Sequence, residues 1–95
     1  MKMFFMIYDV DYDDDVMEML STCRVVGFTK WGRVLGKGGR SDPKLDDAVW
    51  PGFNCALMMA VDDITEPILY NAMNSLLKKL GGGLKVFEWP LEKII

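Results

Sequence analysis

Residues 53–61, FNCALMMAV, are the stretch most typical of a β-strand in this chain of 95 residues. Only Asn54 interrupts its apolar side chains, and Asp62 and Asp63 follow it directly. A short apolar run bounded by polar residues predicts a strand inside a sheet that helices cover on one face. The segments on either side decide which kind of sheet that is.

The segment before this strand predicts two further strands and a helix. Residues 3–9, MFFMIYD, are apolar up to a final acid, as expected of a buried strand. Apolar side chains then recur at helical spacing after a cluster of acids, which predicts a helix over residues 13–25 that Gly27 stops. Residues 28–35 alternate loosely and predict a second strand. The clustered acids are Asp9, Asp11, Asp13, Asp14 and Asp15.

The segment after residues 53–61 predicts a second helix and a last strand. The helix is expected to begin at residues 65–67, where a proline in the first turn costs no hydrogen bond, and to end at the glycines of residues 81–83. Residues 84–89 predict a fourth strand closed by Pro90, and residues 91–95 form a short apolar tail. The apolar stripe of the helix comprises Leu69, Ala72, Met73, Leu76, Leu77 and Leu80.

The predicted order is β-α-β-β-α-β, which is the ferredoxin-like α+β plan of a four-stranded antiparallel sheet with two helices on one face. We expect one domain over residues 1–95, because this length allows a single core. The strands carry more apolar side chains than two helices can cover, so we expect burial against other copies of the chain. These side chains are Met3, Phe5, Met6, Met58, Phe87 and Trp89.

The composition narrows the classes of function. A net charge of −3 and a pI near 4.8, with the basic residues spread along the chain, argue against nucleic acid as a partner. No apolar run suits a membrane span or a signal sequence, so we expect a cytoplasmic protein without membrane insertion, with Cys23 and Cys55 reduced in the core. The chain has no histidine and shows no nucleophile beside a base, so we do not expect an enzyme.

A long connection, residues 32–53, GRVLGKGGRSDPKLDDAVWPGF, separates the two middle strands. A hairpin needs only about two to five residues, and connections of this length are usually functional or disordered. We therefore expect the loop at about residues 36–52 to contact a ligand or a partner. Trp50 suits a partner anchor if it is exposed, and the alternative is that it folds back onto the sheet.

Two basic, glycine-rich turns are candidate phosphate sites. Residues 36–40, GKGGR, allow backbone N–H groups and two cations to approach an anion, or they serve as a flexible hinge. Residues 78–85, KKLGGGLK, form a second such turn, whose simpler interpretation is a helix end with lysines that suit the helix dipole. The second turn becomes a stronger candidate only if the fold brings the two turns together.

The acids at residues 9–13 and the methionines each allow a metal-binding interpretation, and each has a simpler one. Alternating acids at residues 9–13 are typical of a calcium loop, but Asp14 stands where such a loop needs glycine and Leu20 where it needs glutamate, so helix capping is favoured. Methionines are soft metal ligands, yet these fall at core-facing positions, where packing is the simpler role. They are Met3, Met6, Met17, Met58, Met59 and Met73.

The order of elements and several short motifs resemble the PII signal-transduction superfamily. Residues 26–29, VGFT, resemble the turn into the second strand, which in that family contributes to an adenine pocket. Residues 36–40 resemble the glycine and basic cluster where the long mobile loop of that family begins. Residues 61–63, VDD, resemble the end of the third strand. Residues 81–87, GGGLKVF, with residues 91–95, LEKII, resemble the phosphate-binding turn, the last strand and the tail.

The resemblance implies a trimer that binds a small anionic effector, such as ATP, ADP or AMP, where subunits meet. It implies that the first glycine turn lies near the phosphate turn of a neighbour, and that the ligand orders a loop that signals to a protein or transporter. Alternatives are a trimeric interaction module without a small ligand and a metal-binding CutA-like protein. The implied nucleotide-binding residues are Gly27, Phe28, Thr29, Gly36, Lys37, Gly38, Gly39, Arg40, Gly81, Gly82, Gly83 and Lys85. The partner-binding candidates are Asp42, Lys44, Leu45 and Trp50.

Overall fold

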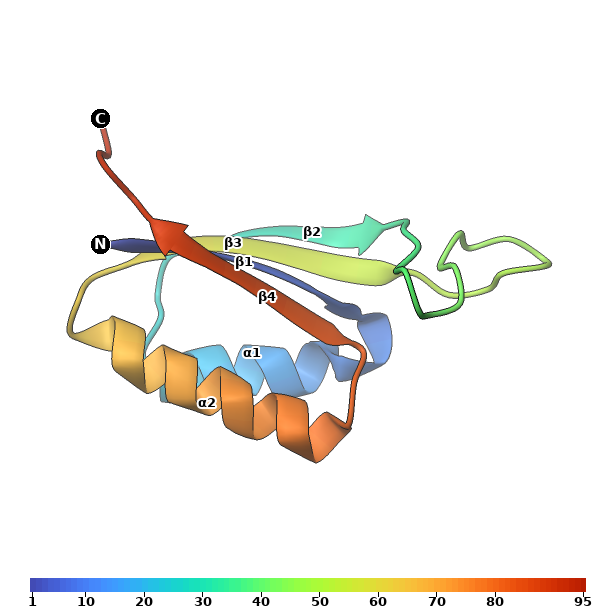
Figure 1. Ribbon diagram of the computed structural model, residues 1–95, viewed down its shortest axis with the longest axis horizontal. Coiled ribbons are helices and arrows are strands. Elements are labelled where there is room, and N and C mark those ends of the chain that lie inside the picture. The colour runs from blue at the N-terminus through green and yellow to red at the C-terminus, as the bar shows by residue number, and fades with distance from the viewer.

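The computed structural model describes residues 1–95 and contains one sheet with two helices on one of its faces (Figure 1). The elements are, in chain order, β1 (Lys2–Asp9), the 3-10 helix η1 (Val10–Tyr12), α1 (Asp13–Thr22), β2 (Thr29–Val34), β3 (Asn54–Val61), α2 (Thr65–Leu80) and β4 (Leu84–Pro90). Neighbouring strands are antiparallel throughout, in the order β2-β3-β1-β4. The predicted ferredoxin-like α+β fold is confirmed.

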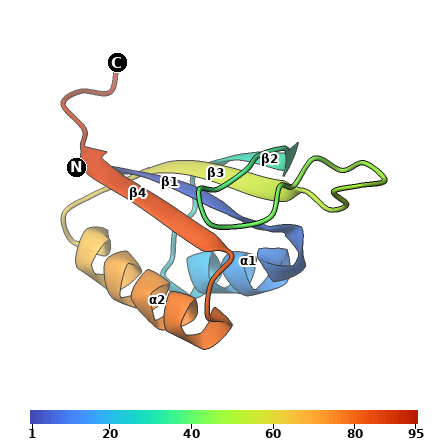
Figure 2. The same cartoon turned by 45° about the vertical axis from the view of Figure 1, so that its right-hand side comes forward.

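The core lies between the sheet and the two helices (Figure 2). Successive side chains of a strand point to opposite faces, so the even-numbered residues of β1 face the helices while Phe5 points away from them. Burying one large apolar side chain contributes about 1.5–3 kcal/mol, and this layer is continuous across the sheet. Its main buried side chains are Phe4, Met6, Tyr8, Val16, Leu20, Leu57, Met59, Leu69, Met73, Leu76 and Leu84.

The end of α1 differs from the prediction. The helix ends at Thr22 rather than near residue 25, and Gly27 does not stop it. Arg24 instead takes the left-handed conformation, with a φ of 60°, and its N–H donates to the carbonyl of Ser21 at 3.0 Å. The N–H of the next residue donates to the carbonyl of Leu20 at 2.9 Å. These bonds form a Schellman cap, in which glycine usually occupies the position that Arg24 holds here.

Replacing Arg24 by glycine is expected to stabilise the fold by about 1 kcal/mol, because a Cβ atom is strained at this positive φ. Urea denaturation would show a higher midpoint with an unchanged slope. Ser21→Gly is the matched control, since it places glycine inside the helix, where it lowers stability. An Arg24→Gly protein that is no more stable than the parent would contradict the cap.

The second face of the sheet carries no helix and is apolar; we call it the open face. Phe5 lies at its centre, with its ring centroid 6.4 Å from that of Trp31 and 6.5 Å from that of Phe87. The expectation that six of the methionines face the core is wrong for two of them, Met3 and Met58, because alternation along their strands points them away from the helices. The open face comprises Met3, Phe5, Ile7, Trp31, Met58, Phe87 and Trp89.

Candidate functional site

The turn after α2 and the long loop both contact the end of β1 at one end of the sheet, within a single chain. The N–H of Asp9, the last residue of β1, donates to the carbonyl of Gly83 at 3.0 Å. The N–H of Val10 donates to the carbonyl of Phe53, where the long loop enters β3, at 3.2 Å. The end of β1 is therefore hydrogen-bonded both to the turn after α2 and to the end of the loop. Figure 1 shows these segments at the end of the sheet from which the long loop extends.

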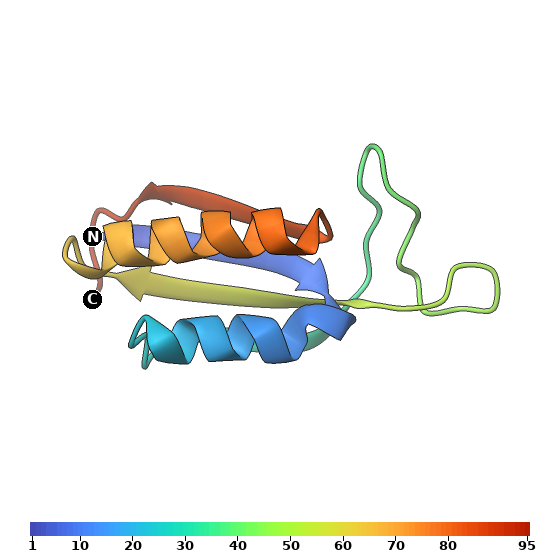
Figure 3. The ribbon, with the colours of Figure 1, turned by 90° about the horizontal axis from the view of Figure 1, so that it is seen from below.

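The long loop has structure of its own and consists of two lobes (Figure 3). The first lobe is closed by Gly36 and Lys44, which exchange two backbone hydrogen bonds at 2.9 and 2.7 Å. The second lobe, residues 45–52, is closed by backbone bonds from Asp46 to Gly52 and from Asp47 to Trp50. Asp47 stabilises its tip, because its carboxylate accepts the N–H of Trp50 at 2.6 Å. Lys44 is thus the neck between the two lobes.

An ion pair attaches this neck to the sheet. The ammonium of Lys44 lies 2.9 Å from Oδ2 of Asp9, and the other carboxylate oxygen of Asp9 accepts the N–H of Asp11 at 2.9 Å. Partial burial of Asp9 favours the neutral acid, but these two contacts outweigh it and hold the pKa of Asp9 below its usual value. The same pair raises the pKa of Lys44. The carboxylate is therefore ionised and bound to the loop at neutral pH.

A second ion pair holds the other lobe. The guanidinium of Arg33, near the end of β2, pairs with the carboxylate of Asp46 and lies over the ring of Phe53 at 5.3 Å from its centroid. Asp46 itself has a positive φ of 54° and its N–H donates to the carbonyl of Gly52 at 3.0 Å. Through its contacts with Asp46 and Phe53, Arg33 joins the start of the long loop to the second lobe and to the end of the loop.

The strand that leads into the loop is fixed by a polar cluster under the sheet. The ammonium of Lys30 in β2 lies 2.7 Å from a carboxylate oxygen of Asp13, which also accepts the hydroxyl of Tyr8 at 2.6 Å. Partial burial opposes the charge on Asp13, but Lys30 and Tyr8 hold the pKa of Asp13 below its usual value. Burial and the bond to Asp13 raise the pKa of Tyr8. The cluster links β1, α1 and β2.

The predicted phosphate-binding residues lie around this end of the sheet. Lys85 of β4 is exposed on the same face as Asp9 and diagonal to it across the β1–β4 ladder. The N–H of Gly36 is not free for an anion, because it donates to the carbonyl of Lys44. The side chains of Lys37 and Arg40, in the first lobe, are exposed. The exposed residues of the first lobe include Lys37, Gly38, Gly39 and Arg40, and the turn after α2 consists of Gly81, Gly82 and Gly83, all with positive φ.

The predicted adenine-binding residues lie elsewhere in the chain. Residues 27–29 line a shallow, 380 Å³ pocket on the open face together with Met3 and Met58. This pocket is at the start of β2, whereas Gly36 follows the end of that strand, roughly 16 Å away at about 3.3 Å per residue. Residues 81–83 lead into β4, at the opposite edge of the sheet. Gly27, Phe28 and Thr29 therefore share no pocket with residues 81–83 of the same chain.

The predicted partner-binding residues occupy different environments. Asp42, Leu45 and Trp50 are exposed, and Trp50 does not fold back onto the sheet but keeps 38% of its surface accessible. Lys44 differs from them, because its side chain is engaged by Asp9 at the neck. Sequence reasoning placed Asp9 among helix-capping acids and did not find this ion pair, since nothing local connects the two residues.

Tyr12 is a further residue that the sequence did not single out. A Cβ atom added to Gly83 would lie 2.6 Å from Cε2 of the Tyr12 ring, so the ring closes against the backbone of the glycine turn. Gly83 also has a φ of +75°, a conformation that favours glycine. The third glycine of the turn is therefore required by both its conformation and its neighbour.

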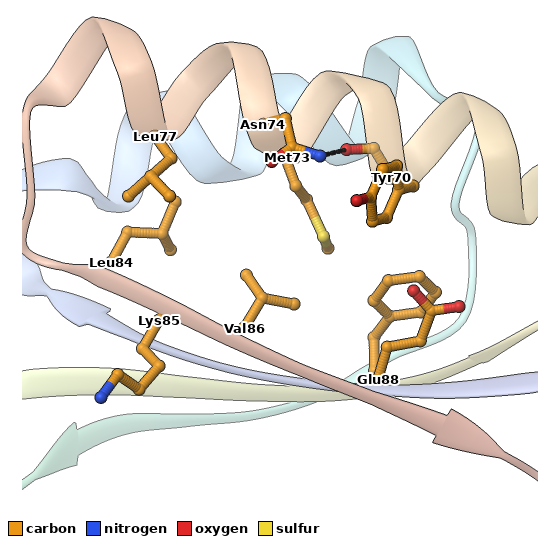
Figure 4. Close-up of a pocket in the computed structure, with 9 residues that line it drawn as sticks. Tyr70, Met73, Asn74, Leu77, Leu84, Lys85, Val86 and Glu88 are labelled. Atoms are coloured by element: carbon orange, nitrogen blue, oxygen red, sulfur yellow. Dashed lines mark hydrogen bonds between the residues drawn. The ribbon is translucent and has the colours of Figure 1, made fainter.

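A groove of 310 Å³ lies between α2 and the outer edge of β4 (Figure 4). Tyr70 and Leu77 form its helix wall, and Leu84 and Val86 form its strand wall. Desolvation and the nearby carboxylate of Glu66 raise the pKa of Glu88, which lies at one end of the groove. β4 is an edge strand of the sheet, so its outer edge has no strand paired to it.

No group of three or more His, Cys, Asp or Glu side chains is placed to hold a metal ion. Neither helix has the length and apolar character that crossing a membrane requires.

Solved structures with the same fold belong to PII-like proteins. CPII from Thiomonas intermedia K12 bound to ADP and bicarbonate has a TM-score of 0.70 and 17% identity, over 93% of this chain and 84% of that chain. CPII bound to ADP, AMP and acetate has a TM-score of 0.71 and 18% identity, over 92% and 81%. The apo form, described as a nitrogen regulatory PII-like protein, has a TM-score of 0.63 and 17% identity, over 93% and 87%. No protein-family model and no curated protein matches the sequence.

The chain therefore has the fold of the PII-like proteins, and the resemblance inferred from its sequence is confirmed at the level of the fold.

Proposed function

We propose that this protein is a PII-like regulator that binds an adenine nucleotide between subunits and signals to a protein partner through its long loop. The observation that carries the proposal is the convergence of the glycine turn at residues 81–83, Lys85 and the neck of the loop on one end of one sheet. Backbone N–H groups and cations at a glycine turn suit a phosphate. The ADP and AMP held by CPII, which has the same fold, support this class of ligand.

The free edges of the sheet support assembly into a closed ring. β2 and β4 are the two edge strands, and three antiparallel pairings between them make them run in opposite directions. Rotation about an axis along the strands preserves strand direction, so β4 of one copy meets β2 of the next as an antiparallel partner. The open faces then point inward and are buried. We propose a homotrimer of this kind.

A shared site follows from the positions of the two half-sites. Within one chain, the pocket at residues 27–29 lies beside the edge strand β2, whereas the turn at residues 81–83 leads into the opposite edge strand, β4. The proposal therefore assigns the adenine ring and the phosphates of one nucleotide to different copies of the chain. An exposed loop above this interface would report whether the site is filled.

A second candidate function is a trimeric interaction module that needs no small ligand. It is favoured by the internal bonds of the loop, which close both lobes without any ligand and present Trp50 and Val49 at the surface. Under this alternative, Trp50→Ala would weaken partner binding while nucleotides would have no effect.

Calorimetric titration with ADP, AMP and ATP separates the two candidates. We expect at least one nucleotide to bind, and Lys85→Ala to weaken its affinity by about tenfold through loss of a charge-assisted hydrogen bond. Lys2→Ala is the matched control, because Lys2 begins β1 at the far end of the same sheet. Unchanged affinity in Lys85→Ala would contradict the site, and no heat with any nucleotide would favour the interaction module.

A further inference from the structure

We propose that Asp9 is a built-in competitor of the anionic effector: its carboxylate occupies Lys44 in the free protein, and a bound phosphate takes Lys44 over and releases the neck of the loop. This inference rests on the proposed function and adds its regulation. It assigns Lys44 to the effector site, whereas the sequence placed it among partner contacts.

The position of Asp9 carries the first step. Its N–H bonds to the carbonyl of Gly83, Oδ1 accepts the N–H of Asp11, and Oδ2 lies 2.9 Å from the ammonium of Lys44. One residue thus contacts the glycine turn, η1 and the loop together. A phosphate at this turn would lie beside the Asp9 carboxylate and would compete with it for the same ammonium.

The position of Lys44 carries the second step. Its backbone closes the first lobe against Gly36, and the second lobe begins at the next residue. Its Nζ lies 3.6 Å from where a Cβ of Gly52 would stand, so the side chain also lies against the end of the second lobe. A change of partner for this one ammonium therefore acts on both lobes, while the separate pair of Arg33 and Asp46 keeps the loop attached.

The competition also limits the class of effector. The carboxylate of Asp9 is already a monoanion held in place by the chain, so a free monoanion offers Lys44 no additional charge and must also lose its own freedom of movement. A phosphate with two negative charges binds both Lys44 and the nearby Lys85, which a single carboxylate oxygen cannot do. The device therefore favours the terminal phosphate of a nucleotide over small carboxylates.

Neutralising Asp9 tests the competition. Asp9→Asn keeps the oxygen that accepts the Asp11 N–H, because asparagine caps a helix as well as aspartate does, and it removes the charge that holds Lys44. Calorimetry with ADP should show affinity tighter by about threefold to fivefold, the upper part of the range expected for one partly exposed ion pair. Asp11→Asn is the matched control, since it removes an equal charge two residues away that forms no ion pair, and it should change affinity by less than about twofold.

A double-mutant cycle assigns the effect to Lys44. Lys44→Met keeps the side-chain stem beside Gly52 and removes the ammonium; it should bind ADP more weakly than the parent. Adding Asp9→Asn to Lys44→Met should then give less than about a twofold further change, because the competitor has lost its target. A full tightening in the double mutant would overturn the role of Lys44.

Hydrogen exchange provides a readout that does not depend on nucleotide. Amides of residues 36–52 should exchange faster in Asp9→Asn than in the parent, because the neck has lost its attachment. Unchanged exchange overturns the inference even if affinity shifts. If the parent binds ADP and Asp9→Asn binds it no more tightly, the competition is wrong and the proposed function stands. If neither binds any nucleotide, the proposed function fails, and the inference fails with it.

Discussion

Phe5→Glu is expected to convert the proposed trimer into monomers that remain folded. Phe5 lies at the centre of the open face, where its ring contacts Trp31 and Phe87. In a single chain this position is only partly buried, so the longer, flexible glutamate can reach solvent and the fold loses about 1 kcal/mol of aromatic contact. In a closed ring the same carboxylate would be buried without a partner, which costs several kcal/mol for each copy.

Light scattering coupled to gel filtration measures this outcome directly. The parent should have the mass of three chains and Phe5→Glu that of one, while circular dichroism should show the same helix and strand content for both. Ile68→Glu is the matched control, because Ile68 is 54% exposed on α2, away from the open face, and its change should leave the trimer intact. A trimeric Phe5→Glu protein, or a monomeric parent, would rule out burial of this face in the ring.

Gly83→Ala is expected to lower stability by about 2–3 kcal/mol and to weaken nucleotide binding by more than tenfold. The left-handed conformation of Gly83 costs a residue with a Cβ about 1 kcal/mol. The new methyl group would also stand 2.6 Å from the Tyr12 ring, and displacing a packed ring costs about 1–2 kcal/mol more. The carbonyl of Gly83 accepts the N–H of Asp9, so a shifted turn also disturbs the site itself.

Gly81→Ala is the control for the conformational part of this effect. Gly81 has a φ of +72° but no atom within 4 Å of an added Cβ, so its replacement should cost only about 1 kcal/mol and leave binding nearly unchanged. Urea denaturation and calorimetry of the two variants would separate strain from contact. Equal losses in both would show that the contact between Tyr12 and residue 83 has no energetic role.

The elements of the fold were predictable because each carries its own local signal. The strand at residues 53–61 is marked by its apolar run, and α2 is marked by a proline in its first turn and glycines after its last. The end of α1 was not predictable, because a non-glycine residue, Arg24, adopts the conformation that closes it. The sidedness of Met3 and Met58 needed the register of β1 against β3, which only the paired structure supplies.

The candidate site was only partly predictable. Sequence alone marked the glycine turns, because glycine and charge are local features, and the family resemblance brought them together only across subunits. It missed that the second turn and the end of the long loop both bond to the end of β1 in one chain, since the bonds from Asp9 to Gly83 and from Val10 to Phe53 join distant segments. The pairing of Lys44 with Asp9 spans 35 positions (44 − 9) and has no signature in either neighbourhood.

The neck at Lys44 separates the two lobes of the loop, and this affects how the sequence can change during evolution. Each lobe of the loop is closed by its own backbone bonds, so a change of length in one lobe is not transmitted to the other. Lengthening a closed loop adds little entropic cost, about 0.6 kcal/mol per doubling. Insertions and deletions in the second lobe should therefore be tolerated without moving the residues near the glycine turns. Related proteins would then acquire new partners through one lobe while keeping the same effector.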